Sequence, residues 1–416
     1  MRRTYRSLIT LWHAAVWCAC SAQDNPMRTP AYPFLDLDAN AMITAGDQRT
    51  WNGLLSKMDR LMFDGRGQLS IVHIGGSHVQ ADMWTMELRH RLQTVVPGVR
   101  AARGFIFPFN MARTNNPYWY HPEYTGRWTS VKNTVRNDAS ELGLAGYSVT
   151  TTDTLSELKV SFRGEAYDGY VFDRVKVLHA MDSSFAVEAW STDTDAVITK
   201  RTDRLRGFTE FTYDALTDTL RLRFVRTDST QKHFTLYGIL LETDDPGFVY
   251  HAIGVNGAST SSYLRCQRFS EDLALLRPDL VVFSIGINDA HDTEFDAQRF
   301  KENYRQLIDN ARKADPDVAV LLTTNTDSYL KRRTPNPNAS RVRDVMRELS
   351  AEKGCAVWDT FGVMGGLGSI ARWQDAGMAQ RDRIHLTRAG YTVLGDLLFS
   401  ALMTNYGDHV RATYQP

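Results

Sequence analysis

Two segments far apart in this chain carry residues that could together hydrolyse an ester. Ser77 follows an apolar run and two glycines at 70–79, and an amphipathic segment comes directly after it. A strand that ends in a tight turn and opens a helix exposes a serine hydroxyl as a nucleophile. In the segment 382–385, Asp382 and His385 are separated by two residues, so one turn can hold the carboxylate against the imidazole. The expected chemistry is attack by Ser77 with His385 as base and Asp382 as its orienting partner.

Two further segments supply candidate donors for the negative charge that such an attack creates. Asn288 follows the apolar run 281–287 and a glycine turn, and its amide could stabilise a developing oxyanion by about 3–4 kcal/mol. Gly257 lies in a glycine-containing turn at 254–260, where the missing side chain lets a substrate oxygen approach the backbone N–H. Gly254 is one short turn away and remains an alternative for this second donor.

Each segment alone is compatible with an ordinary turn or a helix cap, but their order is informative. A serine turn, a glycine turn, Gly-x-Asn-Asp and Asp-x-x-His follow one another along the chain. This set resembles the four signature blocks of the SGNH/GDSL hydrolase superfamily. The resemblance implies that Ser77 is the nucleophile, that Gly257 and Asn288 are oxyanion donors together with the Ser77 N–H, and that His385 is the base.

The first block departs from that family's usual pattern. It reads Gly75-Gly76-Ser77, whereas the family usually has Gly-Asp-Ser. The missing carboxylate is neither nucleophile nor base, so activity is still expected. In the family it normally helps to hold the active-site loop, so a slow enzyme or a non-catalytic glycan-binding protein stays an alternative.

The elements that must bring these segments together define the expected fold. Three of the blocks close apolar strands, which predicts an α/β fold. The resemblance implies an SGNH-type three-layer sandwich with a central parallel sheet. About 180 residues separate Ser77 from Gly257, far more than one crossover between neighbouring strands needs. Segments such as 158–163 and 219–225 alternate with period two. We therefore expect an inserted all-β sandwich at 128–245, between hydrolase parts at 23–127 and 246–416.

Three stretches narrow the resemblance to the peptidoglycan O-acetylesterases of Gram-negative envelopes. They are Gly-Gly-Ser-His-Val-Gln-Ala-Asp at 75–82, Gly-Phe-Ile-Phe-Pro at 104–108, and Val-Met-Gly-Gly at 363–366 ahead of Trp373. The inserted module of that family is similar to a family 35 carbohydrate-binding module. The resemblance implies removal of O-acetyl groups from N-acetylmuramoyl residues in the periplasm, without a metal or organic cofactor. His78 and Trp373 become candidate site-lining residues, with a core aromatic as the equal alternative for Trp373.

Composition and the N-terminus bound the remaining possibilities. The chain has 48 basic and 48 acidic residues, so nucleic acid is not an expected partner. Residues 1–22 combine early arginines, an apolar stretch and small residues, as in a cleaved signal peptide; acylation at Cys20, which would add a lipid anchor, is the alternative. No later run reaches membrane-spanning length. Of the remaining cysteines, Cys266 and Cys355, separate burial is favoured over a bridge.

Three alternatives to a peptidoglycan esterase stay open at this level. The same catalytic residues would serve an acetylesterase for another polysaccharide, or a lipid or thioester acylhydrolase. A non-catalytic glycan-binding protein is the third. Release of acetate from O-acetylated peptidoglycan, compared with release from acetylated xylan, separates the two glycan substrates. A preference for long acyl chains indicates the lipid or thioester hydrolase, and release of acetate from an acetyl ester excludes the non-catalytic protein.

Overall fold

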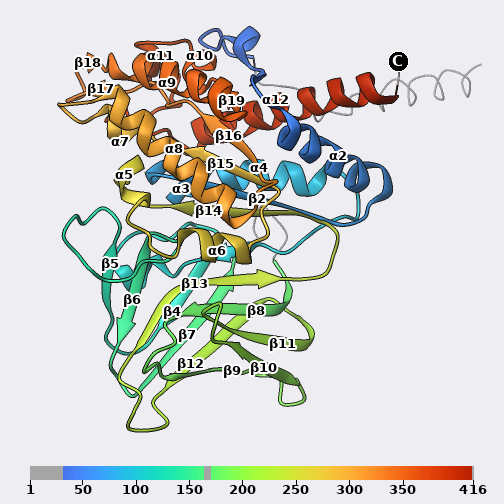
Figure 1. The fold of residues 1–416 in the computed structure, drawn as a ribbon, viewed down its shortest axis with the longest axis vertical. Helices are drawn as coiled ribbons and strands as arrows, with labels where there is room; N and C mark the ends of the chain where they lie inside the picture. The colour runs from blue at the N-terminus through green and yellow to red at the C-terminus, as the bar shows by residue number, and fades with distance from the viewer. Residues whose placement is uncertain (1–30, 164–169, 415–416) are drawn as a thin grey trace, which may run out of the picture.

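A six-stranded sheet forms the centre of the upper part of the molecule in Figure 1, a computed structural model that describes residues 31–163 and 170–414. The expected signal segment 1–22, including Cys20, lies outside the described residues. No helix within those two ranges is both long and apolar enough to cross a membrane. Cys266 and Cys355 are both buried and free.

The strands of this sheet come from both ends of the chain. They are Met42–Thr44 (β1), Gln68–Gly75 (β2), Gly247–Gly254 (β14), Leu280–Ser284 (β15), Ala319–Thr323 (β16) and Ala356–Trp358 (β19). Their order across the sheet is β1-β19-β16-β15-β2-β14. Neighbours pair in parallel except β1, which runs antiparallel to β19. The sheet therefore brings segments far apart in sequence side by side.

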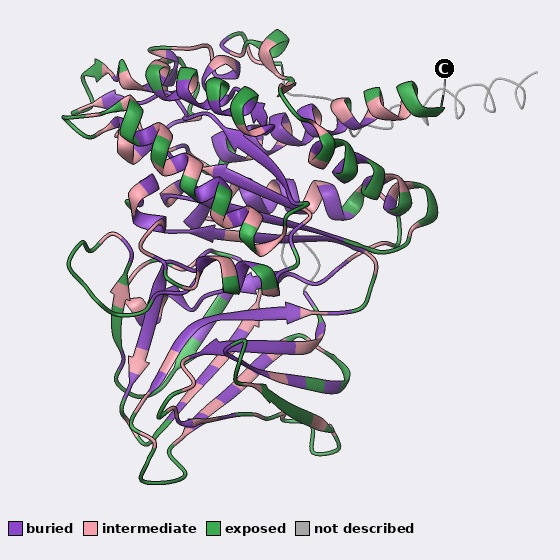
Figure 2. Ribbon diagram, viewed as in Figure 1, coloured by how far each residue is buried: buried purple, intermediate pink, exposed green. Residues whose placement is uncertain are grey.

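Helices cover both faces of the sheet, as parallel strands require. Successive residues such as Ile71 and Val72 belong to two different hydrophobic clusters, one on each side. Figure 2 shows these strands buried and the helices exposed on their outer sides. One face packs against Arg49–Asp64 (α2), Trp84–Thr94 (α4), Thr360–Val363 (α10), Ser369–Asp375 (α11) and Arg388–Tyr414 (α12). The other packs against Phe269–Leu275 (α6), Ala297–Ala314 (α8) and Asn338–Lys353 (α9).

The carboxyl ends of three parallel strands coincide at one edge of the sheet. Gly75 of β2 pairs with Gly254 of β14 on one side and with Ser284 of β15 on the other. A short helix follows each strand: Ser77–Gln80 (α3), Thr260–Tyr263 (α5) and Ile287–Ala290 (α7). Polar groups that follow adjacent parallel strands meet at this edge, which is where ligands bind in open α/β sheets.

A sandwich of antiparallel sheets occupies the lower part of the molecule in Figure 1. Phe224 and Phe234, from opposite sheets, pack with ring centroids 4.3 Å apart. The seven-stranded sheet contains Gly104–Ile106 (β3), Thr129–Lys132 (β5), Tyr147–Thr151 (β6), Phe172–His179 (β8), Ile198–Asp203 (β10), Phe208–Thr217 (β11) and Phe234–Glu242 (β13). The four-stranded sheet contains Tyr120–Tyr124 (β4), Leu155–Phe162 (β7), Ala186–Ala189 (β9) and Thr219–Val225 (β12).

This sandwich is separate from the parallel sheet in its pairing. Among the described residues, none of its strands pairs with a strand of the central sheet. The predicted fold class, an α/β sandwich accompanied by antiparallel sheets, is confirmed. Antiparallel pairing begins upstream of residue 128, because β3 pairs with β13 and β4 pairs with β7. One hydrophobic cluster runs without interruption from the sandwich into the α/β layers.

Smaller elements complete the chain. They are the 3₁₀ turns Leu37–Ala39 (η1) and Phe109–Ala112 (η2) and the two-stranded ribbon Tyr329–Leu330 (β17) and Thr334–Pro335 (β18).

Candidate active site

Ser77 lies at the junction of β2 and α3, where the sequence pattern places it. It is the first residue of α3 and is partly exposed, whereas the strand before it is buried. Its Oγ lies 2.8 Å from Nε2 of His385, 308 residues further along the chain. Hydrogen-bond contact between a serine and an imidazole is the geometry that a serine nucleophile and its base require.

His385 is held on its other side by Asp382. The imidazole Nδ1 lies 2.7 Å from Oδ2 of Asp382. The second carboxylate oxygen, Oδ1, accepts hydrogen bonds from the backbone N–H groups of Ile384 (2.9 Å) and His385 (3.0 Å). Partial burial would raise the pKa of Asp382, but the hydrogen bonds from His385 and these two N–H groups outweigh it and lower that pKa. The carboxylate therefore stays ionised beside the imidazole.

The glycine turn after β14 places Gly257, rather than Gly254, at the pocket. Gly254 is buried at the end of the strand, and a side chain there would lie 2.1 Å from the backbone nitrogen of Gln80. Gly257 has a φ of +83° and open space where a side chain would be. Within the described residues, no hydrogen bond occupies the backbone N–H of Gly257 or of Ser77. Both N–H groups are therefore available to a ligand.

Asn288 lies beside the glycine turn that follows β14. Its Nδ2 donates a hydrogen bond to the carbonyl of Ala258 at 2.9 Å, which leaves the second N–H of the amide for a ligand. The next residue, Asp289, accepts hydrogen bonds from the backbone N–H (3.0 Å) and the hydroxyl (2.6 Å) of Thr260. These contacts clamp the turn after β15 to the turn after β14.

Gly76 stands where the related family usually has aspartate. A Cβ at this position would lie 3.3 Å from Nδ2 of Asn288, so a side chain there would face the amide directly. The carboxylate that joins the loops in this chain belongs to Asp289.

Gln80 is a positioning residue that the sequence pattern left unassigned. Its Oε1 accepts a hydrogen bond from the backbone N–H of Asn256 at 2.7 Å, and its Nε2 donates to the carbonyl of Asn115 at 3.0 Å. It therefore ties the helix of Ser77 to the turn of Gly257. The stretch 75–82 contains it, but only its contacts reveal this connection.

His78 lies behind the base rather than in the pocket. Its ring stacks on that of His385 with centroids 5.1 Å apart, and its Nδ1 lies 2.8 Å from the hydroxyl of Tyr391. Burial, and to a lesser extent the neighbouring His385, lowers the pKa of His78 to about 3. A neutral His78 supports the face of His385 without adding a competing charge.

Trp373 does not line the pocket. It is completely buried in the hydrophobic cluster formed with α2 and α12, and its indole N–H donates to the carbonyl of Met364 at 3.2 Å. Trp373 is therefore a core aromatic, which was the alternative interpretation of the sequence. His291 lies on the pocket wall instead, with Nε2 3.0 Å from the hydroxyl of Ser328.

All four candidate groups open onto one cavity of about 570 Å³. Ser77, Gly257, Asn288 and His385 line it together. Apolar contacts at its wall come from Met83, Ile287, Ile384 and Leu386, and a charged group from Arg388. The cavity can thus accept a small acyl group beside a nucleophile, a base and three N–H donors, the arrangement that acyl transfer requires.

Comparison with protein families agrees with this arrangement. Residues 229–393 match the model of the GDSL-like Lipase/Acylhydrolase family. The matched range contains Gly257, Asn288, Asp382 and His385, whereas Ser77 precedes it. No curated protein matches the chain.

Several solved structures are similar to all or part of this chain. One solved as a peptidoglycan O-acetylesterase superposes with a TM-score of 0.73 at 19% identity, over 88% of this chain and 99% of that chain. An acetyl xylan esterase superposes with a TM-score of 0.31 at 24% identity, over 37% of this chain and 81% of that chain. A GDSL-like lipase from Bacteroides thetaiotaomicron superposes with a TM-score of 0.29 at 19% identity, over 38% of this chain and 76% of that chain. The first likeness shows a shared fold across both the α/β part and the antiparallel sheets.

Proposed function

We propose that this chain is an esterase that removes O-acetyl groups from peptidoglycan. The match of residues 229–393 to the GDSL-like Lipase/Acylhydrolase family model supports the esterase part of this proposal. The observation that carries the proposal is the cavity in which the hydroxyl of Ser77 contacts His385 beside Gly257 and Asn288. The substrate assignment is supported by the fold shared with a peptidoglycan O-acetylesterase across most of both chains. We place the reaction in the periplasm, after export directed by residues 1–22.

The first half of the reaction would transfer the acetyl group to the enzyme. Nε2 of His385 takes the proton of the Ser77 hydroxyl as Oγ attacks the acetyl carbonyl carbon. The carbonyl oxygen becomes an oxyanion that the N–H groups of Ser77, Gly257 and Asn288 stabilise. When the tetrahedral intermediate collapses, the C–O bond to the sugar breaks, and the sugar oxygen takes the proton from His385.

The second half would release acetate. Water replaces the sugar, gives a proton to His385 and attacks the acetyl-enzyme carbonyl, and the same three donors hold the oxyanion. Collapse then breaks the bond to Oγ of Ser77, which recovers its proton from His385. Throughout both steps Asp382 holds Nδ1–H of His385, so that Nε2 alternates between base and acid. The two steps use the side chains of Ser77, Asn288, Asp382 and His385, the backbone N–H groups of Ser77 and Gly257, the substrate and water.

Acetate release tests this assignment. We expect the purified protein to release acetate from O-acetylated peptidoglycan faster than from acetylated xylan and faster than it hydrolyses long-chain acyl esters. Faster release from acetylated xylan would assign another polysaccharide, and a preference for long acyl chains would assign a lipid or thioester substrate. A folded protein that hydrolyses none of these esters would contradict the proposal and favour the non-catalytic glycan-binding alternative.

Substitution of Asn288 by alanine tests the oxyanion contacts. We expect turnover to fall roughly 10²–10³-fold with little change in KM, because the amide acts mainly on the charge that develops during attack. Steady-state kinetics on an acetyl ester give the two parameters separately. Asn52→Ala, at an exposed position of α2, serves as the matched control. A change confined to KM would make Asn288 a substrate-binding residue instead.

A further inference from the structure

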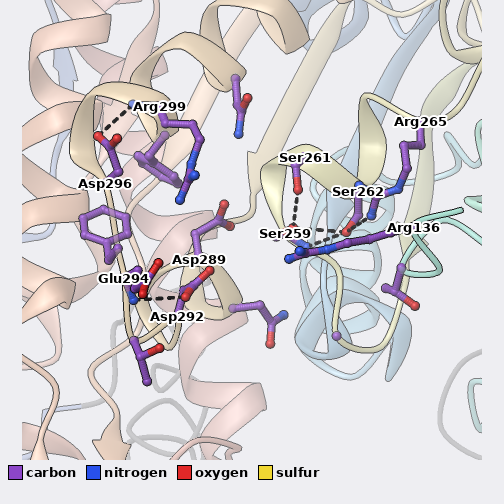
Figure 3. Close-up of a pocket in the computed structure, with 17 residues that line it drawn as sticks. Arg136, Ser259, Ser261, Ser262, Arg265, Asp289, Asp292, Glu294, Asp296 and Arg299 are labelled. Atoms are coloured by element: carbon purple, nitrogen blue, oxygen red, sulfur yellow. Dashed lines mark hydrogen bonds between the residues drawn. The ribbon is translucent and has the colours of Figure 1, made fainter.

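A second cavity adjoins the candidate active site. It has a volume of about 650 Å³ and shares Gly257 and Asn288 with the cavity of Ser77 (Figure 3). The α/β part lines it with α5 and with the segment that joins α7 to α8. The sandwich contributes Thr134 and Arg136, from the loop between β5 and β6. The groove therefore borders the place where an ester would bind at Ser77.

Two arginines from different parts of the fold meet on one wall of the groove. Figure 3 shows Arg136 reaching across from the sandwich loop to the serines of α5, with Arg265 beside it. Arg265 is partly buried and donates to the carbonyl of Asn133 at 2.8 Å and to the hydroxyl of Ser262 at 3.2 Å. Arg136 is exposed. Among the described residues, neither guanidinium forms an ion pair with a carboxylate.

The guanidinium groups of Arg136 and Arg265 carry the same charge and repel each other. Burial, and after it the charge of Arg136, lowers the pKa of Arg265. The opposite wall carries four acidic residues, Asp289, Asp292, Glu294 and Asp296, and three of them accept hydrogen bonds from nearby groups. Asp289 accepts from Thr260, Asp292 from the backbone N–H of Glu294, and Asp296 from the N–H groups that begin α8. The wall formed by Arg136 and Arg265 is therefore cationic and faces an acidic wall, and an anion bound between the two guanidinium groups would reduce their repulsion.

We propose that Arg136 and Arg265 form a subsite that binds a carboxylate of the substrate, so that the enzyme prefers acetyl esters carried by an anionic glycan. This inference rests on the proposed esterase function and adds the charge of its substrate. Guanidinium groups bind carboxylates through paired, charge-assisted hydrogen bonds. In peptidoglycan the carboxylate could belong to the attached peptide or, once the peptide is removed, to the lactyl group of the sugar. An uncharged polysaccharide offers neither.

Arg136→Gln is the informative variant, because Arg136 has no hydrogen bond from its side chain among the described residues and its loss should leave the fold intact. We expect kcat/KM for O-acetylated peptidoglycan to fall roughly tenfold relative to the same material with its carboxylates amidated. The change should lie in KM, since the arginine contacts a part of the substrate that does not react. Arg136→Lys should recover part of the preference, because it keeps the charge but not the paired geometry.

Arg66→Gln is the matched control, because it removes one positive charge from an exposed turn at the opposite end of β2. Peptidoglycan with its peptides intact and the same strands stripped by an amidase distinguish the two sources of the carboxylate. The proposal is overturned if wild-type enzyme does not distinguish anionic from amidated substrate, or if Arg136→Gln lowers both rates equally.

A second pair of probes keeps this test independent of the peptidoglycan assignment. Acetylated glucuronic acid and acetylated glucuronamide differ only in the carboxylate. If peptidoglycan is not hydrolysed, the proposed substrate fails, but a preference for the acid that Arg136→Gln removes would still support the carboxylate subsite. Equal rates on this pair in the wild-type enzyme would then overturn it.

Discussion

Ser77→Ala is expected to lower esterase turnover by several orders of magnitude, up to about 10⁶-fold, while the protein stays folded. The hydroxyl is the group that would form the acetyl-enzyme, and its 2.8 Å contact with His385 would remove its proton. Alanine removes one oxygen atom at a partly exposed position and leaves the backbone N–H of the turn in place. Initial rates of acetate release measure the loss, and circular dichroism checks the fold.

His385→Ala and the double variant make this prediction sharper. Nucleophile and base act as a unit, so each single variant and the double variant should show nearly the same residual rate. Additive losses would mean that the two side chains act in separate steps. Near-normal turnover in folded Ser77→Ala or His385→Ala would remove that residue from the mechanism.

Asp382→Asn is expected to reduce turnover by about 10³–10⁴-fold with little effect on the fold. The oxygen of the asparagine can still accept the backbone N–H groups of Ile384 and His385, so the turn is preserved. Its NH₂ group then faces Nδ1 of His385, where the carboxylate Oδ2 now lies. Nδ1 must become the acceptor, and the ring proton moves to Nε2. A protonated Nε2 cannot take the proton of Ser77.

Asp375→Asn, at an exposed position of α11, is the matched control for this charge change. Kinetics on a small acetyl ester compare the two variants without a contribution from glycan binding. An Asp382→Asn enzyme that retains more than about a tenth of wild-type turnover would mean that other contacts fix the tautomer of His385.

The sequence alone predicted the fold class and the local geometry of the candidate site. An apolar strand followed by glycines and a serine, and an aspartate three residues before a histidine, are local patterns, and the chain folds them locally as expected. Asp382 reaches the ring of His385 within one turn, so its contact needs no distant residue. Alternation with period two likewise indicated the antiparallel sheets, because it reports which face of a strand is buried.

The limits of the antiparallel sheets depended on contacts that no local pattern records. The short strand β3 lies upstream of residue 128, and its pairing with β13 joins residues more than a hundred positions apart. A three-residue strand carries too little periodicity to be recognised alone. Its role follows only from the partner that completes its hydrogen bonds.

The tertiary structure also decided which neighbours each candidate side chain meets. Gly254 and Gly257 both lie in the same glycine-containing segment of the sequence. In the structure Gly254 packs against the backbone of Gln80, whereas Gly257 faces the cavity. Trp373 is an aromatic near a glycine turn, and only the packing of helices around it places it in the core. Arg136 and Arg265 share a groove because the sandwich folds back onto the edge of the parallel sheet. Residue types and spacing specify local geometry, whereas proximity across the fold is created by packing that sums many weak, long-range contacts.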